Sequence, residues 1–267
     1  MTNWAWFGLS QGRLTTGWPE ETVGHGQEGV LGMPRLHPER CAPTCRDCIS
    51  ACPSGAITGG LGESVTLDYG RCVVCQRCTE VCPTGAIEKT TDWAFGVRTR
   101  EALLAGGGGM GSGNAESPPS THVPRGFRRS LHIRHVDAGS CNGCESELEA
   151  LLNPFYNLHR LGIFFTASPR SADLLLVTGP VTVAMKEPLL ETYRAMPEPR
   201  FVMAMGTCAT GGGIAGGGYS CHQGLEGILP VDLWLPGCPP NPAALMEALL
   251  VLLGRRPERG ALPERAG

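Results

Sequence analysis

The stretch Cys141-Asn142-Gly143-Cys144-Glu145-Ser146-Glu147 decides the fold, because it places two thiols in a turn between an expected strand and an expected helix. The strand is the apolar-alternating run 131–136, and the helix covers 145–152. In an α/β sheet such a turn lies at the carboxyl end of a strand, where these folds build their sites. Two thiolates do not complete a metal site, so we expect the rest of the chain to supply partners.

Two more cysteines follow later strand-like runs. Cys208 comes after 201–205, and Cys238 comes after 231–235. Glycines and prolines flank both cysteines, which is typical of tight turns that hold a backbone close to a bulky group. We therefore expect four thiolates to converge on one edge of a parallel sheet and to hold a cubane iron–sulfur cluster: Cys141, Cys144, Cys208 and Cys238.

The second half of the chain alternates between two kinds of segment. Strand-like runs at 162–166 and 173–178 join the three named above, and further helices are expected at 186–195 and 242–253. This alternation predicts an α/β domain with a parallel, doubly wound sheet. The run 174–177 is continuously apolar, as in a central strand that is covered on both faces.

The totals exclude several classes of protein. A length of 267 residues suggests about two domains. The net charge of −3 and the absence of Lys/Arg runs argue against a nucleic-acid partner. The N-terminus lacks a cationic region followed by an apolar core, and no run approaches the roughly 20 apolar residues of a spanning helix. We therefore expect a cytoplasmic chain without a signal peptide.

Cysteine is unusually frequent, with 13 residues. Because we expect no export, metal ligation explains this number better than disulfides do. Twelve of the cysteines fall into three sets of four, and Cys221 is left over. We expect Cys221 to be a small, buried apolar residue, although a ligand or redox role is the alternative.

Eight of the cysteines form a repeat. The run Cys41-x3-Cys45-x2-Cys48-x3-Cys52-Pro53 returns as Cys72-x2-Cys75-x2-Cys78-x3-Cys82-Pro83, and Gly-Ala-Ile follows each copy two residues after the proline. This pattern resembles the bacterial two-cluster ferredoxin, in which the fourth cysteine of each run binds the other cluster. The resemblance implies two [4Fe-4S] clusters, one held by Cys41, Cys45, Cys48 and Cys82 and the other by Cys72, Cys75, Cys78 and Cys52. The chain departs from the family in its three-residue first gap, and structural zinc is the alternative occupant.

The segments around this repeat have less regular sequences. A helix is expected over 93–104, followed by a flexible glycine-rich linker. The aromatic residues Trp4, Trp6, Phe7 and Trp18 either pack on the repeat module or dock to a partner subunit. The expected organisation is an aromatic extension for partner docking at 1–40, a small α+β ferredoxin domain at 41–90, a helix and linker at 91–130, the cluster-bearing α/β domain at 131–256 and a tail at 257–267.

The α/β domain resembles the small, electron-transferring subunit of membrane-bound, energy-converting [NiFe] hydrogenases of the formate hydrogenlyase type. It is more distantly similar to the cluster-bearing subunit beside the quinone site of complex I. The residues that carry the resemblance are Cys141-Asn142-Gly143-Cys144 with Glu147, Ser168-Pro169-Arg170-x2-Asp173, Thr178-Gly179-x-Val181-Thr182, Gly206-x-Cys208, Gly212-Gly213 and Pro236-Gly237-Cys238-Pro239-Pro240-x-Pro242. The family fold is flavodoxin-like, which agrees with the alternation. The ferredoxin half resembles a separate subunit of the same complexes.

The resemblance implies an electron-transfer subunit with three [4Fe-4S] clusters and no catalytic residues of its own. Its partners would be a [NiFe] large subunit, membrane subunits, and a donor such as formate dehydrogenase, carbon monoxide dehydrogenase or ferredoxin. The chain would then lie on the cytoplasmic face of the inner membrane. Complex I relatives carry adjacent cysteines in place of Cys141-x2-Cys144, which favours the hydrogenase branch. A nickel-free complex that reduces quinone or moves ions, and a stand-alone electron carrier, remain as alternatives.

Other polar residues near the third cysteine set have two interpretations. Glu147 lies early in a helix, where interaction with the helix N-terminus is expected, and redox-coupled proton movement is the alternative. The glycines around Cys208 suit backbone amides directed at cluster sulfurs, and simple loop flexibility is the alternative. The histidines are not needed as ligands, and we expect His132 and His135 to be hydrogen-bonded structural residues.

Overall fold

The structure is a computed structural model that describes residues 6, 9–10, 12, 14–21, 24–59, 65–106, 123–124 and 126–258. Trp4, Phe7, most of the glycine-rich linker and nearly all of the 257–267 tail lie outside the described residues. Among the described helices, none has the length and apolar character needed to cross a membrane.

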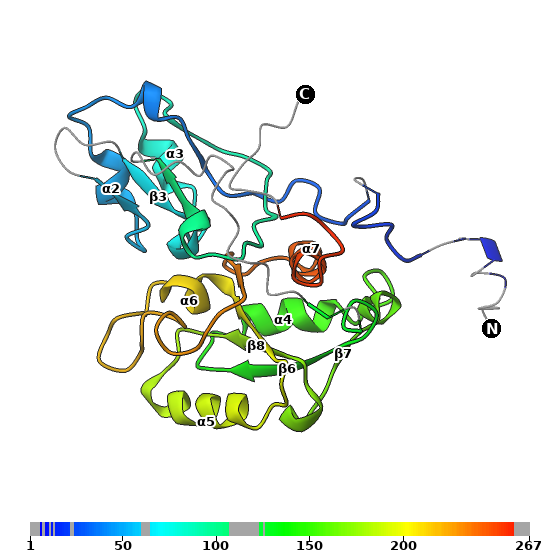
Figure 1. The fold of residues 1–267 in the computed structure, drawn as a ribbon. Helices are drawn as coiled ribbons and strands as arrows, with labels where there is room; N and C mark the ends of the chain where they lie inside the picture. The colour runs from blue at the N-terminus through cyan, green and yellow to red at the C-terminus, as the bar shows by residue number, and fades with distance from the viewer. Residues whose placement is uncertain are drawn as a thin grey trace.

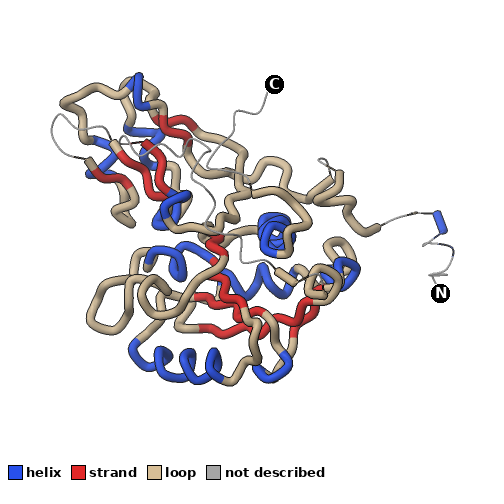
Figure 2. Tube along the Cα trace, viewed as in Figure 1, coloured by secondary structure: helices blue, strands red, loops and turns tan. Residues whose placement is uncertain are grey.

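The larger domain is built on one five-stranded parallel sheet (Figures 1 and 2). Its spatial order is β10-β9-β8-β6-β7. In chain order these strands are β6 (Leu131–Asp137), β7 (Ile163–Phe165), β8 (Leu174–Thr178), β9 (Phe201–Met205) and β10 (Leu233–Leu235). This is the flavodoxin-like strand order, with its topological switch point between β6 and β8. The α/β prediction is confirmed, and the five strands lie where the alternation placed them.

Helices cover both faces of this sheet. In Figure 1, α5 (Val183–Arg194) lies on one face, and α4 (Gly143–Ala150) and α7 (Pro242–Leu252) lie on the other. Side-chain caps start two of them: Thr182 Oγ1 accepts a hydrogen bond from Met185 N, and Asn241 Oδ1 accepts one from Ala244 N. Strands β8 and β9 are buried along their whole length, as continuous apolar runs require. The short helix α6 (Gly206–Gly211) follows β9 directly.

The smaller module carries the cysteine repeat on short elements. Helices α2 (Asp47–Ala51) and α3 (Arg77–Val81) lie beside two small antiparallel sheets, ordered β1-β4 and β2-β3-β5. The strands are β1 (Arg35–Leu36), β2 (Ile57–Thr58), β3 (Thr66–Asp68), β4 (Ile87–Glu88) and β5 (Leu104–Gly106), and the 3₁₀ turns are η1 (Pro38–Arg40), η2 (Tyr69–Arg71) and η3 (Glu101–Leu103). One hydrophobic core runs from this module into the face of the large sheet that α5 covers.

The prediction of a helix over 93–104 is wrong. Val97 instead forms an antiparallel bridge to Trp234 on the edge strand β10, with N–O distances of 2.9 and 2.7 Å. Beyond it, η3 and β5 return the chain to the small module, where β5 pairs with β3. Both partners are distant in sequence, so a periodicity within 93–104 could not reveal them.

The N-terminal segment contacts both domains: β1 pairs with β4 of the small module, whereas Trp18 packs on the larger domain. Trp18 is 4% exposed, and its indole N–H donates to the carbonyl of Ala243 in α7 at 2.9 Å. Its ring also contacts His25 and Trp93. Trp6, in contrast, is 70% exposed. The segment therefore covers α7, which is buried along its whole length.

Candidate metal centres

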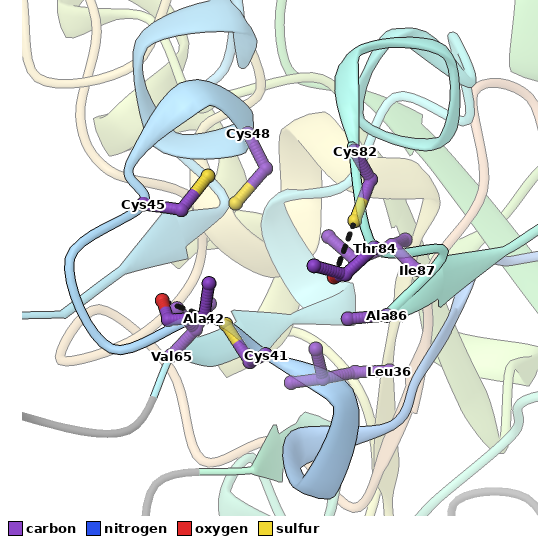
Figure 3. Close-up of a pocket in the computed structure, with 10 residues that line it drawn as sticks. All are labelled: Leu36, Cys41, Ala42, Cys45, Cys48, Val65, Cys82, Thr84, Ala86 and Ile87. Atoms are coloured by element: carbon purple, nitrogen blue, oxygen red, sulfur yellow. Dashed lines mark hydrogen bonds between the residues drawn. The ribbon is translucent and has the colours of Figure 1, made fainter.

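The first set of cysteines borders a cavity in the small module. Cys45 precedes α2, Cys48 lies within it, Cys41 follows η1, and Cys82 follows α3. Figure 3 shows their four side chains around one space. The rest of the lining is mostly apolar: Leu36, Ala42, Val65, Thr84, Ala86 and Ile87. The wider first gap of the repeat thus leaves Cys41 within the same group as its three partners.

The second set borders a matching cavity formed by Cys52, Cys72, Cys75 and Cys78. Both cavities are lined by four cysteines and by mostly apolar side chains, as two copies of one repeat should be. In both, the fourth cysteine of one run joins the first three of the other. The structure therefore groups the eight cysteines into two separate sets of four, in the crossed arrangement that the resemblance implies.

Backbone amides point at several of these sulfurs. Ala56 N lies 3.3 Å from Cys52 Sγ, and Val74 N lies 3.4 Å from Cys72 Sγ. Val74 and Gln76 have φ of 57° and 62°, a left-handed conformation that is uncommon for a β-branched residue such as valine. Such strain gathers at ligand-binding loops, and hydrogen bonds to sulfur tune cluster potentials. Sequence reasoning missed these amides, because no residue type marks them.

The third set lies at the carboxyl edge of the large sheet, beside the switch point. Cys141 follows β6, Cys144 lies in the first turn of α4, Cys208 lies in α6, and Cys238 follows β10. Asn142 takes a left-handed φ of 70° and turns the chain between the first two. The loops that carry the other cysteines meet here, because a Cβ at Gly206, two residues before Cys208, would lie 2.6 Å from Cys144 Sγ and 3.5 Å from the carbonyl of Gly237, which precedes Cys238. The predicted convergence therefore occurs.

Glycines form a close cradle around these sulfurs. A Cβ at Gly206, whose φ is 85°, would lie 2.6 Å from Cys144 Sγ. A Cβ at Gly213 would lie 2.9 Å from Cys208 Sγ. Gly211 has a different role, because it packs against the Gly70 carbonyl of the small module. Close approach, rather than loop flexibility, thus explains the first two glycines.

The chemistry of the donor sets fits a positively charged metal group. Burial raises the pKa of Cys72 to about 12 and of Cys78 to about 11. Burial, followed by the charges of Cys238 and Cys141, raises the pKa of Cys208 to about 11. Ligating thiols must be deprotonated, so a bound metal would supply the charge that stabilises these thiolates. The sulfurs border each space rather than meet at one point: across the described residues, no three Cys, His, Asp or Glu side chains share the position of a single ion.

Glu145 anchors a hydrogen-bonded network behind the third set that the sequence did not reveal. Its carboxylate accepts from Ser140 Oγ at 2.6 Å and from Thr178 Oγ1. His135 Nε2 lies 2.9 Å from Thr178 Oγ1 and 3.5 Å from Glu145 Oε1, and burial lowers the His135 pKa. These groups come from β6, the turn that follows it, β8 and α4, which only the sheet brings together. The network holds the start of α4 against the strand ends.

The remaining candidates near the third set have simpler environments. Burial raises the pKa of Glu147, and the acidic residue in the first turn of α4 is Glu145 rather than Glu147. His132 is hydrogen-bonded, with Nδ1 3.3 Å from Asp173 Oδ2, so that both structural histidines have the contacts predicted for them. Cys221 is only half-buried, which corrects the expectation of a buried residue, and it lies near enough to Cys208 to raise that thiol's pKa.

Two known protein families match the chain. Residues 141–252 match the family described as NADH ubiquinone oxidoreductase, 20 Kd subunit, and residues 40–87 match the 4Fe-4S dicluster domain. These two ranges contain all thirteen cysteines, the twelve of the candidate sets and Cys221, so every candidate ligand falls inside a matched region.

Three known proteins are similar to the chain over about half of its length. Formate hydrogenlyase subunit 7 of Escherichia coli (strain K12) is 43% identical over 128 residues, 48% of this chain and 50% of the relative. The chain thus spans half the length of that relative. The probable membrane-bound hydrogenase subunit mbhJ of Pyrococcus furiosus is 40% identical over 141 residues, 52% of this chain and 84% of the relative. A Methanocaldococcus jannaschii protein is 46% identical over 123 residues, 46% of this chain and 82% of the relative.

Two solved structures are also similar. One is the membrane-bound sulfane sulfur reductase, an archaeal respiratory membrane complex, with 35% identity and a TM-score of 0.44 over 48% of this chain and 71% of that one. The other is an NAD⁺-reducing [NiFe]-hydrogenase in its H₂-reduced state, with 21% identity and a TM-score of 0.40 over 50% of this chain and 96% of that one.

Proposed function

Because the chain belongs to the family of the NADH ubiquinone oxidoreductase 20 kDa subunit and carries a 4Fe-4S dicluster domain, we propose that it is an electron-transfer subunit of a hydrogenase complex. It would relay electrons from a low-potential donor through three [4Fe-4S] clusters to a separate [NiFe] catalytic subunit. The observation that carries the proposal is the grouping of twelve cysteines into three sets of four.

Each residue set has a distinct part in this function. Cys41, Cys45, Cys48 and Cys82 would hold one cluster, Cys52, Cys72, Cys75 and Cys78 a second, and Cys141, Cys144, Cys208 and Cys238 a third. When bound, such a cluster accepts and releases single electrons at a potential set by its ligands, hydrogen bonds and burial. The chain's own contribution is to hold the thiolates, to direct Ala56 N and Val74 N at sulfurs, and to surround two of the sets with largely apolar side chains.

The names of the relatives support a membrane-bound hydrogenase complex as the setting of this chain. A [NiFe] large subunit, membrane subunits, and a donor such as formate dehydrogenase, carbon monoxide dehydrogenase or ferredoxin are the proposed partners. The proposed location is the cytoplasmic face of the membrane, reached through those subunits. The second candidate is an equivalent subunit of a nickel-free complex that reduces quinone or is coupled to ion transport, which the name of the matched 20 kDa family favours.

Anaerobic purification with native partners tests the proposal. We expect about twelve irons on this chain, the arithmetic of three cubanes, with nickel in a co-purifying subunit and hydrogen evolution. The full iron content without nickel or hydrogen evolution would favour the second candidate function, a subunit of a nickel-free complex. Zinc in place of iron would overturn both.

A further inference from the structure

The small module docks on the large domain through buried hydrogen bonds between η2 and α6. Thr210 Oγ1 donates to the Gly70 carbonyl at 2.6 Å, and Thr207 Oγ1 donates to the Cys72 carbonyl at 2.8 Å. Arg100 adds a third contact from the segment between β4 and η3, because its Nε donates to the Thr210 carbonyl at 3.0 Å. The interface therefore joins the second cysteine set directly to the helix that carries Cys208.

Thr207 occupies a special place in this interface. Its hydroxyl donates to the Cys72 carbonyl and also accepts from Gly237 N at 3.3 Å. In return, Thr207 N donates to the Gly237 carbonyl at 2.8 Å. Gly237 precedes Cys238, and Thr207 itself precedes Cys208. One side chain, 1% exposed, thus connects the backbones beside three candidate ligands from two different sites.

The hydroxyl is needed chemically at this position. A threonine hydroxyl offers one proton and acceptor lone pairs, and both functions are used here. Valine has nearly the same shape, but it would leave the Cys72 carbonyl without this donor and Gly237 N without this acceptor. Buried groups that lose a partner in this way bear the full cost of desolvation. The small gap between Gly206 and Cys144 Sγ leaves α6 little room to shift in response.

We propose that Thr207 is a positioning residue that fixes the second cysteine set against the third, so that electrons pass between these two sites within this chain. The electron-transfer part of this inference rests on the proposed function. Thr207 itself gains and loses no electron. Its role is to keep the backbone that carries the second cysteine set at a constant distance from the backbone that carries the third.

The test compares T207V with T207S and with T210V as a matched control. Both valine variants remove one hydroxyl and one buried hydrogen bond between the domains, but only Thr207 contacts the backbone of Cys72 and Gly237. In the chain without clusters, T207V should speed hydrogen exchange at the Gly237 amide roughly tenfold, the loss expected for one buried hydrogen bond. T207S should restore near wild-type exchange at Gly237, and T210V should leave it unchanged.

The chain with its iron–sulfur clusters bound provides the second readout. With all clusters reduced, the electron paramagnetic resonance splitting between neighbouring clusters should decrease in T207V and be retained in T207S and T210V. Equal splitting in T207V and wild type, or equal effects of T207V and T210V, would overturn the inference. A wild-type chain that takes up no iron would instead overturn the proposed function, and unchanged Gly237 exchange in T207V would then reject the positioning role independently.

Discussion

Arg100 and Asp68 form a two-bond ion pair beside the contact between the domains. Nη1–Oδ1 and Nη2–Oδ2 measure 2.8 and 2.6 Å, and the two side chains are 13% and 17% exposed. The same guanidinium reaches the Thr210 carbonyl through Nε. Asp68 in turn caps η2 by accepting from Gly70 N at 2.8 Å. This pair therefore links the core of the small module to α6.

Removing the Arg100 side chain should destabilise the protein strongly. R100A leaves the Asp68 carboxylate largely buried without its cation, at a cost of about 3 kcal/mol in the free energy of unfolding. R194A is the matched control, because Arg194 pairs with Glu187 and Glu191 on an exposed surface, where solvent screening leaves an ion pair only a small contribution to stability. Denaturant unfolding measures both variants, and equal losses would contradict the importance assigned to the buried pair.

Single cysteine replacements should separate the crossed sets. C82S should remove the cluster of the first set and spare the second, whereas C52S should do the reverse, because each fourth cysteine borders the cavity of the other run. Each variant should lose about four of twelve irons, the content of one cubane. Iron analysis with electron paramagnetic resonance gives the readout. C221S is the control and should retain all iron; losing iron there would show that the ligand sets are misassigned.

Alanine at Gly206 should disturb the third set. The new methyl group would lie 2.6 Å from Cys144 Sγ, in a backbone with φ of 85°. G227A has a similar φ of 73° but open space around its methyl group. The control should therefore show only the backbone strain, about 1–2 kcal/mol, whereas G206A should be less stable and lose the third cluster. If G206A kept its full iron content, the claim that Gly206 is needed for the close approach to Cys144 Sγ would be wrong.

Glutamine at Glu147 tests its two interpretations. Burial raises the Glu147 pKa from its ordinary value of 4.5, so the folded state favours the protonated form. Its contribution to stability is therefore fully present below that value and is lost as pH rises through the raised pKa. At neutral pH, E147Q should be slightly more stable than wild type, with the difference vanishing at low pH. Turnover of the assembled complex and its pH profile should stay unchanged; a shifted profile would favour redox-coupled proton movement.

Local patterns in the sequence were sufficient for the regular elements and for the cysteine sets. Leu174–Thr178 and Phe201–Met205 are continuous apolar runs, and a run of this kind needs cover on both faces wherever it lies. The short, fixed spacing of the cysteines within each repeat likewise indicates a loop that can place their sulfurs around one metal group. Such signals are contained in neighbouring residues, so that they can be interpreted without the fold.

Only the tertiary structure decided how the two halves meet. The pairing of Val97 with Trp234 replaced an expected helix, and Trp18 found its partner in α7 rather than in the repeat module. The bond from Thr207 to Cys72 joins residues 135 positions apart, and no local periodicity encodes it. The sequence by itself determined which cysteines form each of the three sets. Long-range packing and hydrogen bonding determined that the second set lies against the third, because these contacts join residues that no local pattern connects.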